Sequence, residues 1–391
     1  MNKQYLPTIV IAISLILGAC TPSATATAPA ILVPATEATS EPIKIATCGP
    51  ITGDGAIWGT QQQQGVQLAI DDINANGGLL GRKVELVPFD DKGDAKEAVS
   101  VAQRIVDDQT IVAVIGHMYS SLSKAAGPIY TKGKIPMVAV AATNPAVVTV
   151  GGEYVFRINL SDAAAGADMA VYTVQKLNKK RIAVLMDQTD YSQGVYDAYS
   201  AKATELGAEI VSLQKFVGGQ DKDFTVMLTT IMGTNPDVIL ADGYQAEAAL
   251  IAQQMKTLGI DVTLEIPDGA TDPTYLELAG DAAEGTIAFS YYNPTLQDPK
   301  IEDLKMKYKA KYNGELLTYV PYAYDAMMAI ADAIKIAGGT DRTAIRDALE
   351  KVNDPNGVTG PISFVNRDRA VGWSVVLKVQ DGKFVFVEKS R

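Results

Sequence analysis

His117, the only histidine of this 391-residue chain, stands three residues before the serine pair Ser120–Ser121 in the segment GHMYSS. An imidazole beside a hydroxyl could act as the general base for a serine nucleophile. The same serines stand where a helix is expected to begin, and the first backbone N–H groups of a helix have no partner within it. Such a position favours a bound anion. The segment therefore raises two possibilities, a hydrolase and an anion-binding loop.

The hydrolase interpretation finds little support elsewhere in the chain. The motif Gly-x-Ser-x-Gly, which marks the nucleophile of many hydrolases, does not occur. His117 and Ser120 meet at a strand–helix junction, where their geometry is poor for proton transfer, although a carboxylate base stays possible. We expect His117 to be a packed or hydrogen-bonded loop residue. Zinc sites that need two histidines are excluded, and we predict no catalytic residue, no metal and no cofactor.

Phosphate-binding motifs are absent or incomplete. The chain lacks Gly-x4-Gly-Lys-Ser/Thr, so we do not expect it to hydrolyse ATP. The segment GPITGDGAIWG approaches a dinucleotide fingerprint, with Gly53 and Gly55 after the first predicted strand and Asp90 at the end of the second. The position of the third glycine is Trp58, whose indole would crowd a pyrophosphate. The match to a dinucleotide site is therefore weak.

Binding of a carboxylate remains as the chemistry of these loops. Ser120 and Ser121 precede a helix that we expect to open at Leu122, and Thr143 in AATNP follows the next predicted strand. In a desolvated site each charge-assisted hydrogen bond contributes on the order of 1.5–3 kcal/mol. The alternative is that these hydroxyls only cap helices and turns.

The elements that must position these residues are visible in the hydrophobic pattern. From residue 43 onward short apolar runs alternate with longer amphipathic segments, which is typical of parallel sheets flanked by helices. The predicted helices span 61–76, 94–109, 191–206, about 223–232 and 246–258. Thr60 with Gln63, and Asp94 with Glu97, have the spacing of capping boxes. A second strand–helix series begins near 181, after the short segment YVFRINL, and the pattern predicts two α/β lobes with a hinge between them.

Polar segments follow the predicted strands of both series. They are GPITGDGAIWG, FDDKGDAKE, GHMYSS, AATNP, DQTDYSQG, DGYQAE and PDGATDP. Ligands of open parallel sheets bind beyond the carboxyl ends of the strands. We therefore expect these segments to face one cleft.

The first 42 residues differ in character from the rest. Lys3 precedes an apolar stretch that is too short to span a bilayer and ends in LGAC, which resembles the lipobox of bacterial lipoproteins. We interpret residues 1–20 as a lipoprotein signal peptide whose cleavage leaves Cys20 as a lipidated N-terminus. The Ser/Thr/Ala/Pro-rich residues 21–42 are interpreted as a disordered tether. These features predict an extracytoplasmic lipoprotein of the cell envelope, membrane-bound only through its anchor.

Charge, cysteine content and size limit what the body of the chain can be. The net charge of −11 argues against nucleic acid as a partner. Cys48 is the only cysteine besides Cys20, so no intrachain disulfide is expected. Residues 43–391 are too many for one ordinary core and suit two domains.

Several longer segments resemble the branched-chain amino acid binding proteins of bacterial ABC importers. They are GAIWGTQQQQGVQLAIDDINANGGLLGRKVEL, GHMYSS with IPMVAVAATNP, AGDAAEG, and YVPYAYDAMMAIADAIKIAG. The similarity runs from about residue 43 to the C-terminus. The resemblance implies a type I periplasmic-binding fold, in which two doubly wound parallel-sheet α/β lobes, joined by a three-segment hinge, close on a ligand.

The resemblance also implies a set of ligand contacts. They correspond to Trp58, Ser120, Ala141, Thr143, Tyr191, Tyr244 and Asp268. Ser120 and Thr143 correspond to donors to the ligand α-carboxylate. The Ala141 carbonyl and the Asp268 carboxylate correspond to acceptors for the α-ammonium, and the three aromatic residues to an apolar wall. Asp268 stands where some members carry the longer glutamate.

Lobe boundaries follow from the same resemblance. Lobe 1 is predicted to comprise 43–160 and 291–365, with helices at 299–312 and 322–337, and lobe 2 to comprise 161–290 and 366–391. Some members have a cysteine at the position of Tyr119 that is bridged to one near Gly93. This chain lacks both cysteines, so packing alone is expected to hold that loop.

The sequence therefore predicts a monomeric, lipid-anchored receptor without enzymatic activity. Its ligand would be an α-amino acid, branched-chain or aliphatic, and its partners, by resemblance, the permease and ATPase subunits of an ABC importer. The alternatives are a binding protein of the same fold for amides, urea or another small carboxylate, and a sensory module that reports to a signalling partner.

Overall fold

The computed structural model describes residues 41–391 with the exception of 54, 294, 296 and 391. The predicted signal peptide, the lipidation site at Cys20 and nearly all of the predicted tether lie outside the described residues. Within the described part of the chain, every helix is too short or too polar to cross a membrane.

The first of two sheets has eight strands in the order β11-β12-β13-β5-β4-β3-β1-β2. Its strands are β1 Ile43–Gly49, β2 Val84–Asp90, β3 Ile111–Gly116, β4 Met137–Ala139, β5 Val155–Arg157, β11 Asn353–Asp354, β12 Ile362–Val365 and β13 Asp368–Arg369. The pairs among β1 to β5 are parallel, whereas β11, β12 and β13 pair antiparallel with one another. All six residues of β3 are buried, which explains the unbroken apolar run IVAVI in the sequence.

The second sheet has seven strands in the order β15-β14-β10-β9-β8-β6-β7. Its strands are β6 Arg181–Asp187, β7 Glu209–Phe216, β8 Val238–Asp242, β9 Thr263–Ile266, β10 Ile287–Ser290, β14 Val375–Gln380 and β15 Lys383–Lys389. The pairs among β6 to β10 are parallel, and β14 adds antiparallel to β10. The second sheet therefore has the same parallel-dominated plan as the first.

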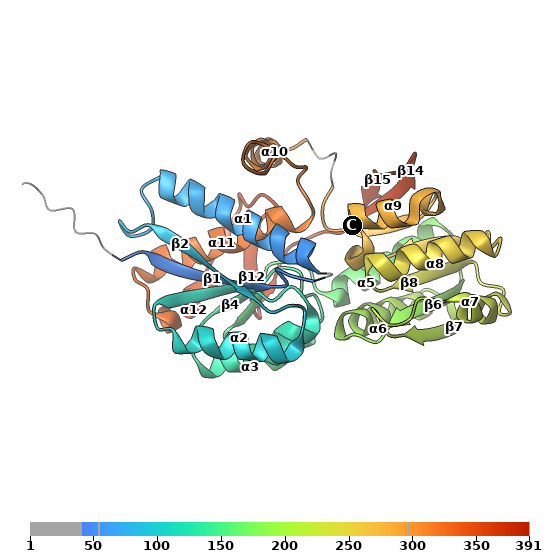
Figure 1. Ribbon diagram of the computed structural model, residues 1–391, viewed down its shortest axis with the longest axis horizontal. Coiled ribbons are helices and arrows are strands. Elements are labelled where there is room, and N and C mark those ends of the chain that lie inside the picture. Colours follow the sequence, from blue (N-terminus) through green and yellow to red (C-terminus); the bar gives the residue numbers. More distant parts are fainter. Residues whose placement is uncertain (1–40, 54, 294, 296, 391) are drawn as a thin grey trace, which may run out of the picture. The chain divides into compact units, whose positions relative to one another are not determined.

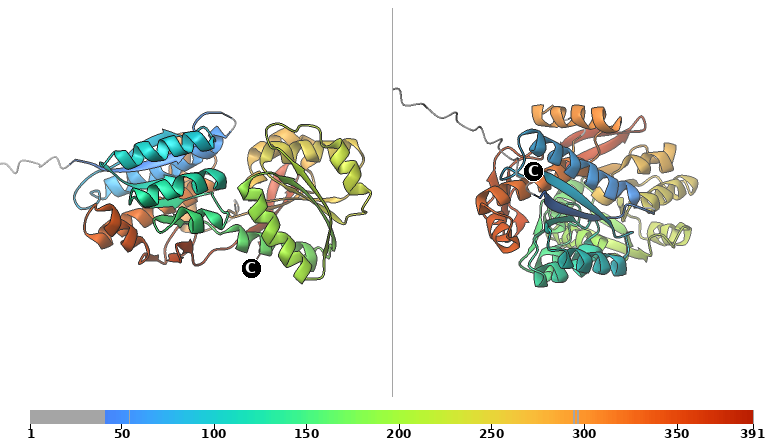
Figure 2. Two further views of the ribbon diagram at one scale, coloured as in Figure 1. Left: turned by 90° about the horizontal axis from the view of Figure 1, so that it is seen from below. Right: turned by 60° about the vertical axis from the view of Figure 1, so that its left-hand side comes forward.

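Helices cover both faces of each sheet (Figure 1). They are α1 Ala56–Ala75, α2 Ala95–Asp107, α3 Ser120–Lys132, α4 Ala146–Gly151, α5 Asp162–Val171, α6 Asp190–Glu205, α7 Thr225–Met232, α8 Gln245–Thr257, α9 Pro273–Ala279, α10 Pro299–Tyr312, α11 Tyr319–Ala337 and α12 Arg342–Leu349. Short helical turns add η1 Tyr172–Lys176, η2 Asp268–Ala270 and η3 Gly280–Ala283. In the first lobe α1 and α11 pack on one face and α2 and α3 on the other; in the second, α7, α8 and α9 oppose α5 and α6 (Figure 2).

Of the two predicted capping boxes, one forms its N-cap half only and the other is wrong. The Asp94 side chain caps α2 by accepting hydrogen bonds from the backbone N–H groups of Lys96 and Glu97. Thr60 instead lies inside α1, which begins at Ala56, before the predicted start. The earlier start is possible because Gly59 packs against the Pro50 carbonyl, at a position where a Cβ would lie only 2.0 Å from that oxygen. The first turn of α1 thereby carries Trp58 into the molecule.

The strand pairing differs from the predicted lobe boundary at the last crossing of the chain. Residues 366–391 were assigned to the second lobe, but β13 pairs with β12 and β5 of the first sheet. The chain therefore passes to the second sheet between Arg369 and Val375. The pattern did not reveal β13 because a two-residue strand has no periodicity.

The first and third connections between the sheets are bound to each other. Arg157, at the end of β5, forms an ion pair with Asp368 of β13, and its backbone N–H donates to the Arg367 carbonyl at 3.0 Å. The Arg369 guanidinium donates in return to the Ile158 carbonyl at 3.0 Å. Arg157, Ile158 and Arg369 are buried, so the bond from Arg369 to the Ile158 carbonyl is shielded from water, whereas Asp368 is partly exposed.

Candidate functional site

A small cavity of about 10 Å³ lies where loops from both sheets meet. It is lined by Trp58, Met118, Tyr119, Ser120, Ala141, Tyr191, Tyr244, Asp268, Gly269 and Tyr319. Six of the seven predicted contact residues are among them, and they follow the carboxyl ends of β1, β3, β4, β6, β8 and β9. Most of the segments expected to face one cleft therefore meet at this cavity. We call this cavity the ligand chamber.

Thr143 is the predicted contact residue that does not line the chamber. It is fully buried, and its carbonyl accepts a hydrogen bond of 2.7 Å from the Arg157 guanidinium, which also binds the Asn144 carbonyl at 2.7 Å. Arg157 therefore fixes the AATNP loop behind the chamber wall. The sequence offered no signal for this role of Arg157, because the AATNP loop and β5 come into contact only in the folded protein.

Ser120 is the first residue of α3 and is almost fully buried at the chamber wall. Its Oγ accepts a hydrogen bond of 3.2 Å from the Asn144 backbone N–H. The hydroxyl can still donate, and the N–H groups of the first turn of α3 have no acceptor within the helix. This wall of the chamber can therefore bind a carboxylate.

Asp268 also lines the chamber, and its carboxylate favours a positively charged ligand group. Its Oδ1 accepts a hydrogen bond of 2.8 Å from the Tyr191 hydroxyl, and its Oδ2 accepts one of 2.9 Å from the Tyr319 hydroxyl. Burial raises the pKa of the Asp268 carboxyl, and the tyrosine hydroxyls partly offset this shift. Tyr319 belongs to α11 of the first lobe and Asp268 to the turn after β9 of the second. The role of Tyr319 was not predicted, although the motif YVPYAYD contains it.

Aromatic rings complete the chamber. The Trp58 ring lies 5.0 Å from that of Tyr319 and 6.0 Å from that of Tyr244, measured between centroids. Tyr244 stacks in turn on Tyr191 at 5.4 Å. The Trp58 Nε1–H is buried without a hydrogen-bond partner among the described residues. The rings form an apolar surface next to the two polar ends of the chamber.

Two further acids lie in the same region of the fold and were missed as site residues. Asp162 and Asp242 are both fully buried. Burial raises the pKa of Asp162 well above its usual range, and the nearby charge of Asp268 raises it further. Burial and Asp162 do the same to the pKa of Asp242. A positively charged ligand group in this region would stabilise the ionised forms of these acids.

His117 is a hydrogen-bonded buried residue, as predicted. Its Nδ1 lies 2.6 Å from Asp91 Oδ2 and its Nε2 lies 3.1 Å from the Tyr130 hydroxyl. Its carbonyl accepts a hydrogen bond from Ser123, and Ser120 bonds elsewhere. The serine and histidine of the opening segment are therefore not paired as nucleophile and base.

Further contacts join the two lobes beside the chamber. Lys124 of α3 forms an ion pair with Asp190 of α6, and the Asn144 side-chain amide donates to the Asp190 carbonyl. Gln61 of α1 donates to the Asp272 carboxylate at 3.4 Å. Together with the bond from Tyr319 to Asp268, these contacts define a closed arrangement of the two lobes.

The periplasmic binding protein family model matches residues 42–383, which is nearly the whole described part. This chain belongs to that family. The predicted family and the two-lobed α/β fold are thereby confirmed. The family is one of solute-binding proteins, so the prediction that the chain is not an enzyme is confirmed as well.

Relatives of this periplasmic binding protein carry names that state their ligands. A leucine-, isoleucine-, valine-, threonine- and alanine-binding protein of Pseudomonas aeruginosa is 32% identical over 325 residues, covering 83% of this chain and 86% of that protein. A leucine-binding protein of Thermotoga maritima has a TM-score of 0.83 at 35% identity, covering 89% of this chain and 98% of the other. A Streptococcus pneumoniae branched-chain amino acid binding protein, solved with isoleucine, has a TM-score of 0.82 at 32% identity, covering 89% and 100%.

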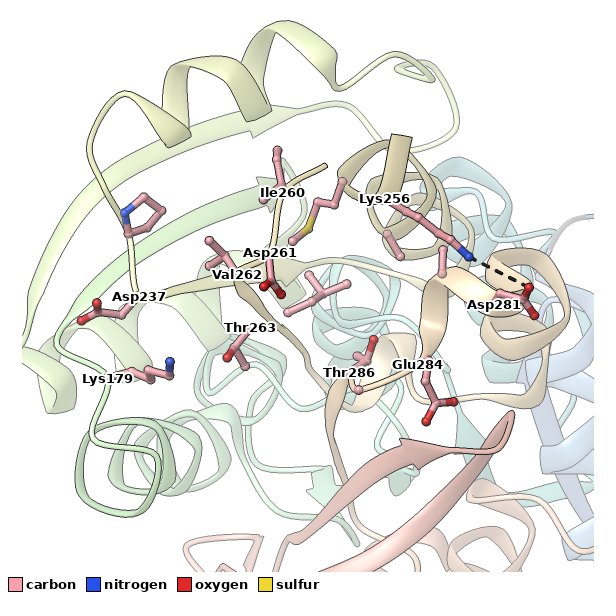
Figure 3. Close-up of a pocket in the computed structure, with 16 residues that line it drawn as sticks. Lys179, Asp237, Lys256, Ile260, Asp261, Val262, Thr263, Asp281, Glu284 and Thr286 are labelled. Carbon is pink, nitrogen blue, oxygen red and sulfur yellow. Dashed lines mark ion pairs between the residues drawn. The ribbon is translucent and has the colours of Figure 1, made fainter. Parts of the chain in front are cut away.

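A much larger hollow of about 670 Å³ lies elsewhere on this periplasmic binding protein, at the amino ends of β8, β9 and β10 (Figure 3). Charged side chains of both signs surround it, including Lys179, Asp261 and Glu284, and Lys256 lies 4.0 Å from Asp281. None of the predicted contact residues lines it. Because the polar loops of a parallel sheet gather at the other ends of the strands, this hollow is not the candidate site.

The lone thiol of the described region is expected to be inert in the native protein. Cys48 is fully buried with its Sγ 3.4 Å from the Tyr130 hydroxyl, and burial raises the pKa of the thiol. Only the thiolate reacts. In a chain lacking residues 1–42, labelling by an aromatic disulfide reagent should be at least about 100-fold slower in buffer than in denaturant. Comparable rates in the two solutions would contradict this assignment.

Proposed function

We propose that this periplasmic binding protein is a receptor for an α-amino acid with an aliphatic side chain. The observation that carries the proposal is the composition of the ligand chamber. A buried carboxylate, Asp268, stands at one polar end and the first turn of α3, with Ser120, at the other. The aromatic rings of Trp58, Tyr244 and Tyr319 line the same cavity. The ligand names of the relatives support the same assignment.

The chemistry of the two polar ends matches a zwitterion. Ser120 and the free N–H groups of α3 would donate to the α-carboxylate. The Ala141 carbonyl and the Asp268 carboxylate would accept from the α-ammonium. In the chamber as described, neutral tyrosine hydroxyls bond to Asp268, and an ammonium replacing one of them would form a stronger, charge-assisted bond. The alkyl side chain would pack on Trp58 and Tyr244.

Closure of the two lobes would be part of binding. A cavity of about 10 Å³ is comparable to the space of one water molecule, so the lobes must separate before an amino acid can enter. The contacts from Tyr319 to Asp268 and from Lys124 to Asp190 would then form again around the ligand. The ligand stabilises the closed state to the extent that it binds that state more tightly.

Anchoring and delivery complete the proposed role. The segment LGAC supports lipidation at Cys20, which would anchor the receptor to a cell-envelope membrane, in the periplasm or at the outer cell surface. The receptor would act as a monomer. The closed receptor would dock on a permease whose ATPase subunits drive import. Retention of the chain in a detergent-phase membrane fraction, lost on Cys20→Ser, would test the anchor.

The proposal is tested directly by calorimetry. Ligand-free protein, prepared by unfolding and refolding, is titrated with leucine, isoleucine, valine, alanine, phenylalanine, glutamine, acetamide, urea and benzoate. We expect one-to-one binding of an aliphatic amino acid with a dissociation constant near or below micromolar, about −8 kcal/mol. Binding of an amide, urea or benzoate with no response to any amino acid would overturn the ligand assignment and leave the fold untouched.

A further inference from the structure

A second cavity lies directly beyond the ligand chamber. It measures about 500 Å³, compared with about 10 Å³ for the chamber. Its lining includes Asp187, Glu247 and Lys222 from the second lobe, and we call it the vestibule. Tyr119 and Tyr244 line both cavities. These two side chains therefore form the wall that the chamber and the vestibule have in common.

The partition is built from ring contacts and from one glycine that leaves room for Tyr119. The Tyr119 and Tyr244 rings meet edge to face at 5.4 Å between centroids. A Cβ at Gly55 would lie 2.4 Å from the Tyr119 hydroxyl oxygen, and one at Gly93 would lie 3.4 Å from the ring. Gly55 therefore leaves room for the Tyr119 hydroxyl, whereas the distance at Gly93 is that of an ordinary van der Waals contact. Both tyrosines are half-buried, as expected for a wall between a closed and an open space.

Tyr119 is the member of the pair that lies one contact further from Asp268, because its ring meets Trp58, which packs on Tyr319, whose hydroxyl bonds to Asp268. It precedes the first residue of α3 with extended backbone angles, φ −94° and ψ 142°, which any residue adopts. Its side chain makes no capping bond to α3. Tyr244, in contrast, stacks on Tyr191, whose hydroxyl bonds to Asp268.

We propose that Tyr119 limits the length of the ligand side chain and that the vestibule is the compartment which a longer side chain would enter. This inference rests on the proposed function, because it takes the ligand to be an α-amino acid with its polar ends at Ser120 and Asp268. A side chain directed along the aromatic wall from Trp58 meets Tyr119, whose ring centroid lies 6.1 Å from that of the tryptophan. Beyond that ring the vestibule has space for several further methylene groups.

The test uses straight-chain α-amino acids, which vary length alone. Norvaline, norleucine, 2-aminoheptanoate and 2-aminooctanoate are titrated into the wild-type protein and the Tyr119→Ala variant. We expect the wild-type dissociation constant to rise steeply at one length. In Tyr119→Ala the rise should move to longer chains, with affinity for 2-aminooctanoate improved at least 10-fold relative to norvaline.

Three further variants make the result specific. Tyr119→Phe keeps the ring and should keep the wild-type length profile, whereas Tyr119→Leu should give an intermediate profile if the alanine variant fails to fold. Tyr312→Ala removes a half-buried tyrosine of α10 outside both cavities and should leave the length profile unchanged.

Parallel length profiles for the wild type and Tyr119→Ala would overturn the inference while leaving the receptor assignment standing. If the wild type binds none of the series and no other α-amino acid, the proposed function itself fails.

Discussion

Replacing Asp268 by asparagine is expected to weaken the binding of an α-amino acid at least about 100-fold. Removing the charged partner of a buried ammonium costs about 3–5 kcal/mol, because the cation then lies uncompensated in a dry site. Asparagine has the size of aspartate, and its Oδ1 can still accept the hydroxyl hydrogen bond that Tyr191 donates. The effect should therefore fall on the ligand and not on the fold.

Calorimetric titration of the wild type and Asp268→Asn with the best-binding amino acid measures this loss. The control is Asp197→Asn, an exposed carboxylate of α6 that is bonded only to the neighbouring Gln193 side chain within the described region. The control should bind like the wild type. Loss of less than about fivefold in Asp268→Asn would show that the ligand places no positive charge at this carboxylate.

Glu265→Gln is expected to make the free energy of unfolding less dependent on pH and to stabilise the protein above neutrality. Glu265 is fully buried on β9, and its carboxylate accepts hydrogen bonds only from the hydroxyls of Thr173, at 2.8 and 2.9 Å, and Tyr199, at 3.0 Å, in the described structure. Burial raises its pKa from 4.5 to about 7. A glutamine side chain can use both partners without carrying a charge.

The sign of the pH dependence follows from proton binding. Between pH 4.5 and about 7 the native state keeps a proton on Glu265 that the unfolded state has lost, so the wild type loses stability as pH rises through this window. Above about pH 7 the loss is complete, at about 3 kcal/mol. Glu265→Gln should not show this pH-dependent loss. The difference in the free energy of unfolding between the variant and the wild type should therefore grow from pH 4.5 to 7 and then stay constant.

Urea denaturation at several pH values, followed by circular dichroism, measures the difference between the two proteins. Other buried acids contribute to the slope in both proteins and cancel in the difference. Glu277→Gln, an exposed position on α9, is the control and should track the wild type at every pH. A constant offset between Glu265→Gln and the wild type from pH 4.5 to 8 would show that Glu265 keeps an ordinary pKa.

Helical periodicity predicted most of the elements, because the amphipathic pattern is a local property of the chain. The helices predicted at 191–206 and 246–258 begin and end one residue earlier, and the helix at 299–312, which was given with the resemblance, has the predicted bounds. The start of α1 was missed because it depends on a close contact between Gly59 and Pro50. That contact leaves no pattern that can be read from the helix sequence alone.

The candidate site was predicted only in part, for a related reason. The resemblance named six residues that line the chamber, but neither periodicity nor motif spacing pointed to Tyr319 or Asp162. Tyr319 reaches Asp268 across 51 positions of sequence. Thr143 was expected at the surface of the site, but the Arg157 guanidinium holds its carbonyl behind the wall. Contacts of this kind are set by tertiary packing, which local sequence does not encode.

The bonds around Arg157 also determine how the two lobes can move. Arg157 and Ile158 on the first connection are tied to Asp368 and Arg369 on the third. Two of the three connecting segments between the lobes are therefore bound to each other and must move together. We expect these contacts to favour a hinge-like rotation of the lobes near the joined segments. Each opening and closing would then return Asp268 to the same position over Ser120, without a search among alternative dockings.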